Sequence, residues 1–492
     1  MPDLSAPGGR RARQTFRYRA YVPDRLDAGE LTFNAATAAD IADAEAAIAV
    51  ANHGQHLVAM ETLARLLLRS ESVASSRIEG LECSQRRLAE AAFAPEHADE
   101  TARQVLANVD TMRQAVDLGS AGHEFTVDDI RGMHELLMRA DRATGRFAGE
   151  FRTQQNWIGG RGDSPRHAAY VPPPPEHVEP LMRDLVAFIN REDMPTLAQA
   201  ALAHAQFETI HPFIDGNGRV GRCLIHAVLA RRQLASRILV PVSLVLAAYG
   251  ELYVQGLVDF REGRADQWCG TFASAARLAI DGAARFEEEF ATMIARWRLE
   301  SEARPGSHLC RACEQTTVTP VFTVAALRDA LNCSNTAATE AIERLEKIGI
   351  VAQVSLGKRN RVYINRAVLR LLDDFERDLL TDAEGKGRLR RSAQAKTAIP
   401  PVLLPSIEHA VLESFPIGTS PPPTTGAIAH VSGYRIDQVR HVLARLADHG
   451  LLDQVDDQHW TLTANGHRLR AMVRAGDDLH RPGMSGGVRG ST

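Results

Sequence analysis

The chain has 492 residues, a length that predicts three or four domains rather than one core. Its 45% hydrophobic and 24% charged residues are typical of a soluble globular protein, and the net charge of -4 means that any nucleic-acid-binding surface must be local. The sequence has no run of about 18 apolar residues and its N-terminus lacks an apolar signal core, which predicts a cytoplasmic protein without a membrane partner.

Helical patterns fill most of the first 300 residues. We expect residues 1–15 to be disordered and residues 16–110 to form an N-terminal helical region. Helices continue through a core at 111–304. Turn residues mark 145–175, and two short extended pieces around 159–163 predict a β-hairpin flap at 154–164 before a polyproline segment. The expected fold class is therefore mainly α.

After residue 305 the pattern becomes helix, turn, helix, strand, turn, strand, and it occurs twice. Residues 305–380 and 405–475 each predict an α+β winged helix-turn-helix unit, because AIERLEKIGIV and VLARLADHGLL both lead a helix into a glycine and a strand. Residues 381–404, with a basic run and two adjacent prolines, predict a linker, and residues 476–492 predict a flexible tail.

The partner of these C-terminal units stays open between DNA and protein. The first unit carries Lys358, Arg359 and Arg361 on its expected wing tip, where they could contact DNA phosphates. Its second helix is acidic, however, which is unfavourable for a helix that reads the major groove. Winged helices also serve as protein-docking or dimerisation modules, so both kinds of partner remain candidates.

The stretch HPFIDGNGR at 211–219 carries the clearest chemistry. Gly216, Asn217 and Gly218 form a glycine-rich turn before a helical pattern, which exposes backbone N–H groups at the positive end of a helix dipole. Phosphate is the commonest ligand of such a site. Arg219 and Arg222 add positive charge where it is unfavourable without a bound anion, so the pattern indicates a polyphosphate.

Two further side chains fit chemistry at a phosphate. Asp215 is a natural Mg²⁺ ligand, because Mg²⁺ takes one or two carboxylates together with phosphate oxygens. His211 can act as a general base for a hydroxyl group. The alternative is that the glycine-rich turn only starts a helix and that His211 is a hydrogen-bonded structural histidine. The coincidence of so many polar and glycine positions favours the functional interpretation.

HPFIDGNGRVGR, residues 211–222, resembles the Fic family pattern HxFx(D/E)GNGRxxR at every defined position. FRYRAYVPDRL, FRTQQNWIGG and AAYVPPPPEHV also look like parts of multidomain Fic proteins, and the likeness extends over roughly residues 16–300. The resemblance implies a Fic-type helical bundle with a flap that pairs with an extended target segment.

The resemblance implies a Mg²⁺-dependent protein adenylyltransferase that transfers AMP from ATP to a Ser, Thr or Tyr hydroxyl of a protein, this chain itself included. His211 would deprotonate the hydroxyl, and Asp215 would hold Mg²⁺ or, as an alternative, Mn²⁺. Phe213 would anchor the loop without a chemical role. The residues expected to contact ATP are Gly216, Asn217, Gly218, Arg219, Gly221 and Arg222. A homodimer is a further expectation from the family.

SSRIEG at 75–80 resembles the inhibitory motif of the family, (S/T)xxxE(G/N). Ser75 and Glu79 are four residues apart and share a helix face, and Gly80 can end the helix. In the family this glutamate pairs with the second arginine of the motif, here Arg222, and competes with the γ-phosphate. The alternative is a solvated glutamate at a helix end. We expect an auto-inhibited enzyme, in which Glu79 could also support removal of AMP.

A second class of function is a DNA-binding transcription regulator whose Fic domain only senses a nucleotide. The intact His211 favours the enzyme, because a sensor would not need a base.

Overall fold

The computed structural model describes most of the chain from residue 17 to residue 463. The described residues are 17–27, 32–53, 57–159, 165, 168–304, 306–354, 361–385, 411, 414–415, 422–432, 436–448, 452–456 and 459–463. The segments expected to be disordered or flexible, 1–15 and 476–492, lie outside them, as does most of the expected linker. The chain divides into a larger unit, 22–155 with 173–395, and a smaller unit, 1–21 and 156–172 with 396–492.

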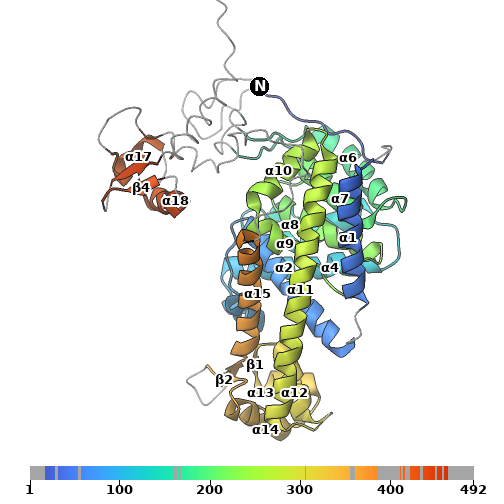
Figure 1. The fold of residues 1–492 in the computed structure, drawn as a ribbon, viewed down its shortest axis with the longest axis vertical. Helices are drawn as coiled ribbons and strands as arrows, with labels where there is room; N and C mark the ends of the chain where they lie inside the picture. The colour runs from blue at the N-terminus through green and yellow to red at the C-terminus, as the bar shows by residue number, and fades with distance from the viewer. Residues whose placement is uncertain are drawn as a thin grey trace, which may run out of the picture. The chain divides into compact units, whose positions relative to one another are not determined.

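The expected mainly α fold is confirmed, and helices dominate the larger unit (Figure 1). Its first part consists of α1 (Ala35–Asn52), α2 (Leu57–Ile78), α3 (Gln85–Phe93), η1 (Pro95–His97), α4 (Glu100–Ser120), α5 (Val127–Met138), η2 (Gly145–Phe147), α6 (Pro175–Ile189), α7 (Thr196–Ile210), α8 (Asn217–Arg231), α9 (Val242–Ala248), α10 (Gly250–Arg261) and α11 (Ala265–Ser301). None of the described helices is long and apolar enough to cross a membrane.

Helices α7 and α8 form the centre of this bundle and carry the HPFIDGNGR stretch between them. Both helices are buried along almost their whole length, which fits their apolar and alanine-rich sequences. Helix α8 packs against both α4 and α7, so the helix itself is held from two sides. The loop between α7 and α8 therefore sits on a rigid base.

The larger unit continues through a second group of elements. These are α12 (His308–Val318), β1 (Val321–Thr323), α13 (Val324–Leu331), α14 (Asn335–Lys347), β2 (Ala352–Gln353), β3 (Val362–Ile364) and α15 (Arg366–Gly385). The strands form an antiparallel sheet of order β1-β3-β2. The helices and strands expected at 305–380 are present, and α15 follows them. The expected wing tip at 355–360 lies outside the described residues, and the winged-helix assignment stays a prediction.

This second group does not pack as a separate core. The long helix α11 extends from the bundle toward α12, and α15 runs back beside it to contact α9 and α2 (Figure 1). Phe322 and Leu345 belong to the same buried cluster as residues of α7 and α8. The expected boundary near 304 therefore does not interrupt the packing of the larger unit.

The described part of the smaller unit has its own small core. It contains α17 (Thr425–Ser432), α18 (Ile436–Asp448), β4 (Leu452–Gln454) and β5 (Trp460–Leu462), with β4 antiparallel to β5. Buried Val439, Leu443 and Trp460 belong to this core. Ile158, within the expected flap at 154–164, forms an antiparallel bridge with Tyr170, while residues 160–164 lie outside the described residues.

Candidate active site

The loop that begins with His211 leaves α7 abruptly. His211 caps the helix in the left-handed conformation, with φ of 49°, and its N–H donates to the carbonyl of Phe207 at 2.8 Å. A residue other than glycine rarely adopts this conformation, and such strain is concentrated at functional sites. The turn redirects the chain toward the N-terminus of α8.

Arg152 holds this turn in place, although no local pattern in the sequence marks it. Its side chain is buried and donates from Nε to the carbonyl of His211 at 2.9 Å and from Nη1 to that of Gln154 at 3.2 Å. Its backbone N–H also donates to the carbonyl of Pro212 at 2.9 Å. A buried arginine with several carbonyl acceptors fixes the loop more firmly than one bond would.

Asn217 closes the loop from the other side. Its Oδ1 accepts from the N–H of Phe213 at 2.9 Å, and its Nδ2 donates to the carbonyl of the same residue at 2.9 Å. Phe213 is fully buried, which agrees with its expected role as an anchor. The asparagine, expected to contact phosphate, thus also ties the loop to the first turn of α8.

His134 on α5 supports the loop through contacts with Phe213 and Asp215. The sequence did not predict this role. The ring of His134 stacks on Phe213 with centroids 3.7 Å apart. Its Nδ1 accepts from the N–H of Gly149 at 2.9 Å, so its proton lies on Nε2, which donates to the carbonyl of Asp215 at 3.1 Å. Burial is the main cause that lowers the pKa of His134 to about 4. The ring is therefore neutral at physiological pH.

The N-terminus of α8 is shaped for an anion. Gly216 caps it with φ of 75°, a conformation that favours glycine, and a Cβ there would lie 2.8 Å from Sδ of Met138. Arg219 is 3% exposed, and among the described residues its Nε and Nη1 have no hydrogen-bond partner. A buried guanidinium whose donors lack partners among the described residues, beside the N–H groups of a helix's first turn, fits a polyphosphate.

Asp215 is placed where a cation could reach it. It is exposed, and its Oδ1 accepts from the N–H of Gly216 at 2.6 Å. One carboxylate beside a phosphate site fits Mg²⁺, which completes its shell with water and phosphate oxygens. In the described part of the chain, no group of three or more His, Cys, Asp and Glu side chains is arranged to hold a metal ion.

The segment that the sequence predicts to be inhibitory, residues 75–80 at the end of α2 (the inhibitory segment below), lies directly against Arg222. Arg222 donates from Nε to Oγ of Ser75 at 2.9 Å and from Nη2 to the carbonyl of Ser75 at 2.7 Å. The same Nη2 donates to Oε1 of Glu79 at 2.8 Å. A Cβ on Gly218 would overlap this oxygen, so the carboxylate lies over the first turn of α8.

The charges in this contact stabilise one another. Burial opposes ionisation of Glu79, yet the guanidinium of Arg222, helped by Arg219 and His211, holds the pKa of this carboxyl below its ordinary value. Burial likewise opposes the charge of Arg222, but Glu79 and other anionic neighbours raise its pKa. The pair is therefore ionised at neutral pH, with the carboxylate 37% exposed and the guanidinium buried.

The structure brings the predicted site residues together, with one placement that was not foreseen. Gly221 faces α7, where a Cβ would lie 2.5 Å from Oε1 of Glu208 and 3.0 Å from the ring of Phe207. Its expected contact with ATP stays a prediction, as do the individual roles of the other site residues.

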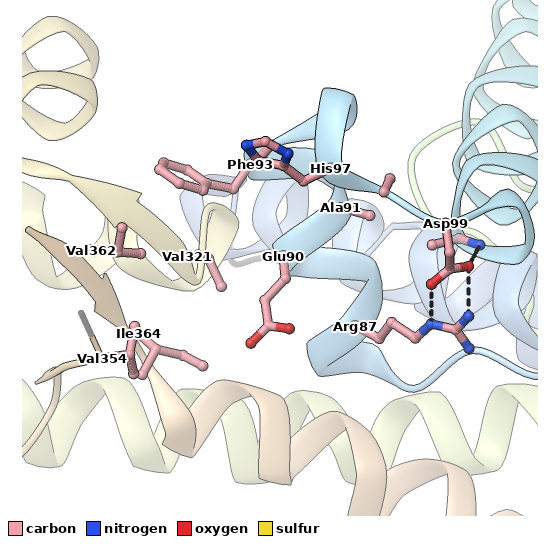
Figure 2. Close-up of a pocket in the computed structure, with 13 residues that line it drawn as sticks. Arg87, Glu90, Ala91, Phe93, His97, Asp99, Val321, Val354, Val362 and Ile364 are labelled. Atoms are coloured by element: carbon pink, nitrogen blue, oxygen red, sulfur yellow. Dashed lines mark hydrogen bonds and ion pairs between the residues drawn. The ribbon is translucent and has the colours of Figure 1, made fainter. Parts of the chain in front are cut away.

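A cavity of about 430 Å³ lies elsewhere in the larger unit, between α3 with η1 and the three-stranded sheet. Figure 2 shows Phe93 and Glu90 of α3 on one side and Val321 and Val362 on the other. Arg87 and Asp99 on its wall form an ion pair with each other. None of the site residues described above lines this cavity.

Comparisons with known proteins agree with the motif. Residues 124–229 match the family model described as the Fic/DOC family, and residues 38–117 match that of the Fic/DOC family N-terminal region. The protein adenylyltransferase fic-1 of Caenorhabditis briggsae is 34% identical over 148 residues, which are 29% of this chain and 27% of that protein. The protein adenylyltransferase Fic of Drosophila erecta is 38% identical over 112 residues, or 22% of this chain and 20% of that protein.

The chain thus spans about a quarter of the length of the curated relatives it matches. Among solved structures, a Fic family protein from Desulfovibrio desulfuricans G20 covers 68% of this chain and 97% of its own length, with 21% identity and a TM-score of 0.44. Fic-1 from Caenorhabditis elegans covers 51% of this chain and 73% of its own, with 24% identity and a TM-score of 0.41.

Proposed function

The chain carries a Fic/DOC domain preceded by the family's N-terminal region, and from that premise we propose that it is an auto-inhibited protein adenylyltransferase. It would transfer AMP from ATP to a Ser, Thr or Tyr hydroxyl of a protein. The observation that carries this proposal is the buried guanidinium of Arg219, two donors of which lack partners among the described residues, in the first turn of α8 after the loop that begins at His211. The names of the relatives, protein adenylyltransferases, support the same reaction.

The reaction needs a base, a phosphate site and correct alignment. Burial, the main cause, lowers the pKa of His211 to about 4, so its ring is neutral and can accept the hydroxyl proton. The hydroxyl oxygen then bonds to the α-phosphorus, the bond from this phosphorus to the bridging oxygen breaks, and pyrophosphate leaves. Arg219 and the N–H groups of α8 would hold the phosphates. Mg²⁺ at Asp215 would neutralise phosphate charge when bound.

The contact between Glu79 and Arg222 supports an inhibited resting state. The guanidinium that would hold the γ-phosphate already donates to Glu79 at 2.8 Å and to Ser75 at 2.7 and 2.9 Å. A carboxylate and a phosphate cannot share these donors, so the γ-phosphate would be displaced from its productive position. Removal of the carboxylate would open the site without loss of the base.

The test is incubation of purified protein with Mg²⁺ and ATP labelled at the α-phosphate. Wild type, Glu79→Gly and Glu79→Gly/His211→Ala are compared, and label on protein is followed. Weak labelling of wild type, strong labelling of Glu79→Gly and no labelling of the double variant would support both transfer and inhibition. If Glu79→Gly stays unlabelled, the assay is repeated with cell lysate as a source of target proteins. No labelling there would reject the transfer.

The second candidate is a nucleotide-sensing regulator that binds DNA through residues 305–380. The adjacent helices α13 and α14, followed by β2 and β3, keep this candidate open. A filter-binding assay with random genomic DNA tests it, and binding that changes with ATP would favour it.

A further inference from the structure

Two buried polar side chains on one face of α7, those of His204 and Glu208, have no role in the proposed mechanism, and His211 follows them as the cap of the helix. His204 and Glu208 are four residues apart and share a face of α7, and His211 lies three residues beyond Glu208 in the left-handed turn that ends the helix. In the part of the chain that the structure describes, each has a buried atom without a hydrogen-bond partner: Nδ1 of His204, Oε1 of Glu208 and Nδ1 of His211. Buried polar atoms nearly always have partners, so these three require an explanation.

Glu208 lies closest to the proposed base. Its Oε2 is 3.9 Å from Nδ1 of His211, and the two side chains are only 10% and 18% exposed. This distance is longer than a hydrogen bond, but a small rotation of either side chain would close it. Hydrogen bonds of catalytic groups are often long before substrate binds and shorten in the reactive complex.

The opposite helix leaves room for this carboxyl group. A Cβ on Gly221 of α8 would lie 2.5 Å from Oε1 of Glu208 and 3.1 Å from Nδ1 of His204. A larger residue at 221 would therefore push Glu208 away from its place. The glycine and the glutamate are complementary in shape across the contact between α7 and α8.

Charged and titratable groups from several elements surround this carboxyl. Burial raises the pKa of Glu208 to about 7, with Glu79 on α2 adding to the rise, while Arg222 on α8 and Arg261 on α10 oppose it. Tyr253 on α10 and His204 on α7 also face this region and hydrogen-bond to each other at 2.9 Å. The carboxyl group thus exchanges between its two protonation states near neutral pH.

We propose that Glu208 is the positioning residue of the base, and that its carboxylate accepts the Nδ1–H of His211 during transfer. This inference rests on the proposed function. The bond would orient Nε2 of His211 toward the attacking hydroxyl. When Nε2 takes the hydroxyl proton, the imidazolium keeps its proton on Nδ1, and the negative charge of Glu208 stabilises it. The proton later returns to solvent from Nε2, so no other reactant is needed.

Two substitutions test this proposal, and together they distinguish the orienting effect of Glu208 from the effect of its charge. Glu208→Gln keeps an oxygen that can accept from Nδ1 but removes the negative charge, and Glu208→Ala removes both. Each is made in the Glu79→Gly background and compared with Glu251→Gln, a change on the exposed start of α10. Self-labelling from α-labelled ATP, or labelling of a lysate target, gives kcat and the KM for ATP across pH 5.5 to 8.5.

We expect kcat to fall about a hundredfold in Glu208→Ala, the lower end of the range for general-base assistance, and less, about tenfold, in Glu208→Gln, which keeps the acceptor for Nδ1–H. The KM for ATP should change less than about twofold, because phosphate contacts are intact. The rise of kcat with pH near neutrality should disappear in both variants and persist in Glu251→Gln.

Three results would overturn the assignment. One is an unchanged kcat with its pH profile retained. Another is a raised KM for ATP with normal kcat, which would mean that Glu208 positions Arg222 for ATP binding rather than His211 for catalysis. The third is a loss of kcat that melting temperatures attribute to unfolding in Glu208→Gln and Glu208→Ala, while a folded Glu208→Asp variant fails to restore the pH profile. If Glu79→Gly itself labels no protein, the proposed function fails instead, and this outcome is seen before any Glu208 variant is made.

Discussion

The carboxylate of Glu376 on α15 accepts a hydrogen bond from Nη2 of Arg77 at 2.8 Å, and thereby joins the helix that follows the three-stranded sheet to the inhibitory segment. The other oxygen of Glu376 accepts from Nε2 of Gln85 at 2.5 Å. Arg77 lies two residues before Glu79, in the last turn of α2. This turn is therefore held from two sides, by Arg222 on one and by Glu376 on the other.

The first prediction is that loss of this second contact weakens inhibition. Glu376→Gln and Arg77→Gln should each raise labelling by α-labelled ATP, because the last turn of α2 loses an ion pair that is largely buried on the glutamate side. An ion pair of this exposure contributes about 1 kcal/mol, so the active population should rise roughly fivefold. The measurement is initial labelling rate relative to wild type and to Glu79→Gly.

A charge exchange supplies the control for this contact. Arg77→Glu combined with Glu376→Arg should return the rate toward the wild-type value, while each single reversal raises it. In the Glu79→Gly background, Glu376→Gln should have no further effect. Equal labelling of wild type and both single variants, with normal melting temperatures, would show that α15 does not hold the inhibitory segment.

The contacts of Arg222 and Arg77 differ in how well they could be predicted from the sequence. The phosphate loop and its helix were predictable, because Gly216, Asn217 and Gly218 are neighbours in the chain and their chemistry is local. The partners of Arg222 lie 143 and 147 residues away, and only the resemblance to a known family linked them. The contact of Arg77 spans 299 residues, and no local pattern marks it.

The supporting residues were missed for the same physical reason. Arg152 reaches the carbonyl of His211 across 59 residues, and His134 reaches that of Asp215 across 81. Each acts on backbone atoms, so neither needs a distinctive neighbour in the sequence. A buried arginine or histidine becomes recognisable only when the fold shows what surrounds it.

The second prediction concerns Arg152. Arg152→Lys keeps a positive charge but loses the planar donors that reach several carbonyl groups, so the His211 turn should become less ordered. In the Glu79→Gly background we expect kcat to fall about tenfold or more with the KM for ATP little changed. Steady-state labelling at varied ATP measures both. The exposed change Arg183→Lys on α6 is the matched control, and an equal loss in both would refute a specific role.

The third prediction is a pH effect on stability from His134. Its folded pKa of about 4 lies below the ordinary value of 6.5, so the unfolded chain binds an extra proton between these values. The stability it contributes is complete above about pH 6.5 and is lost as pH falls toward 4, at up to ~1.4 kcal/mol per pH unit.

His134→Phe isolates this effect. The variant should be about 1–3 kcal/mol less stable at pH 7.5, because Gly149 N–H and the Asp215 carbonyl lose their partner. Its stability should then fall less steeply than that of wild type between pH 6.5 and 4. Urea denaturation at several pH values gives the free energy of unfolding of both proteins. The difference between them isolates His134, because all other titratable groups are common to both chains. Parallel curves would show that His134 is not held neutral by the fold.

The fourth prediction concerns how ATP stabilises the folded chain. In wild type, Glu79 occupies Arg222 and lies over the first turn of α8, so the triphosphate must bind without its full set of donors. In Glu79→Gly these donors are available, and ATP with Mg²⁺ should bind more tightly. A ligand at a hundred times its dissociation constant stabilises the folded state by about 2.7 kcal/mol.

Thermal unfolding with increasing ATP and Mg²⁺ measures this directly. The rise in melting temperature should begin at lower ATP in Glu79→Gly than in wild type. With ADP the difference should shrink, because the γ-phosphate is the group that competes with Glu79. In Glu79→Gly/Arg222→Ala the advantage over wild type should vanish. Identical ATP curves for wild type and Glu79→Gly would mean that Glu79 does not compete for Arg222, and that any inhibition acts on alignment rather than on binding.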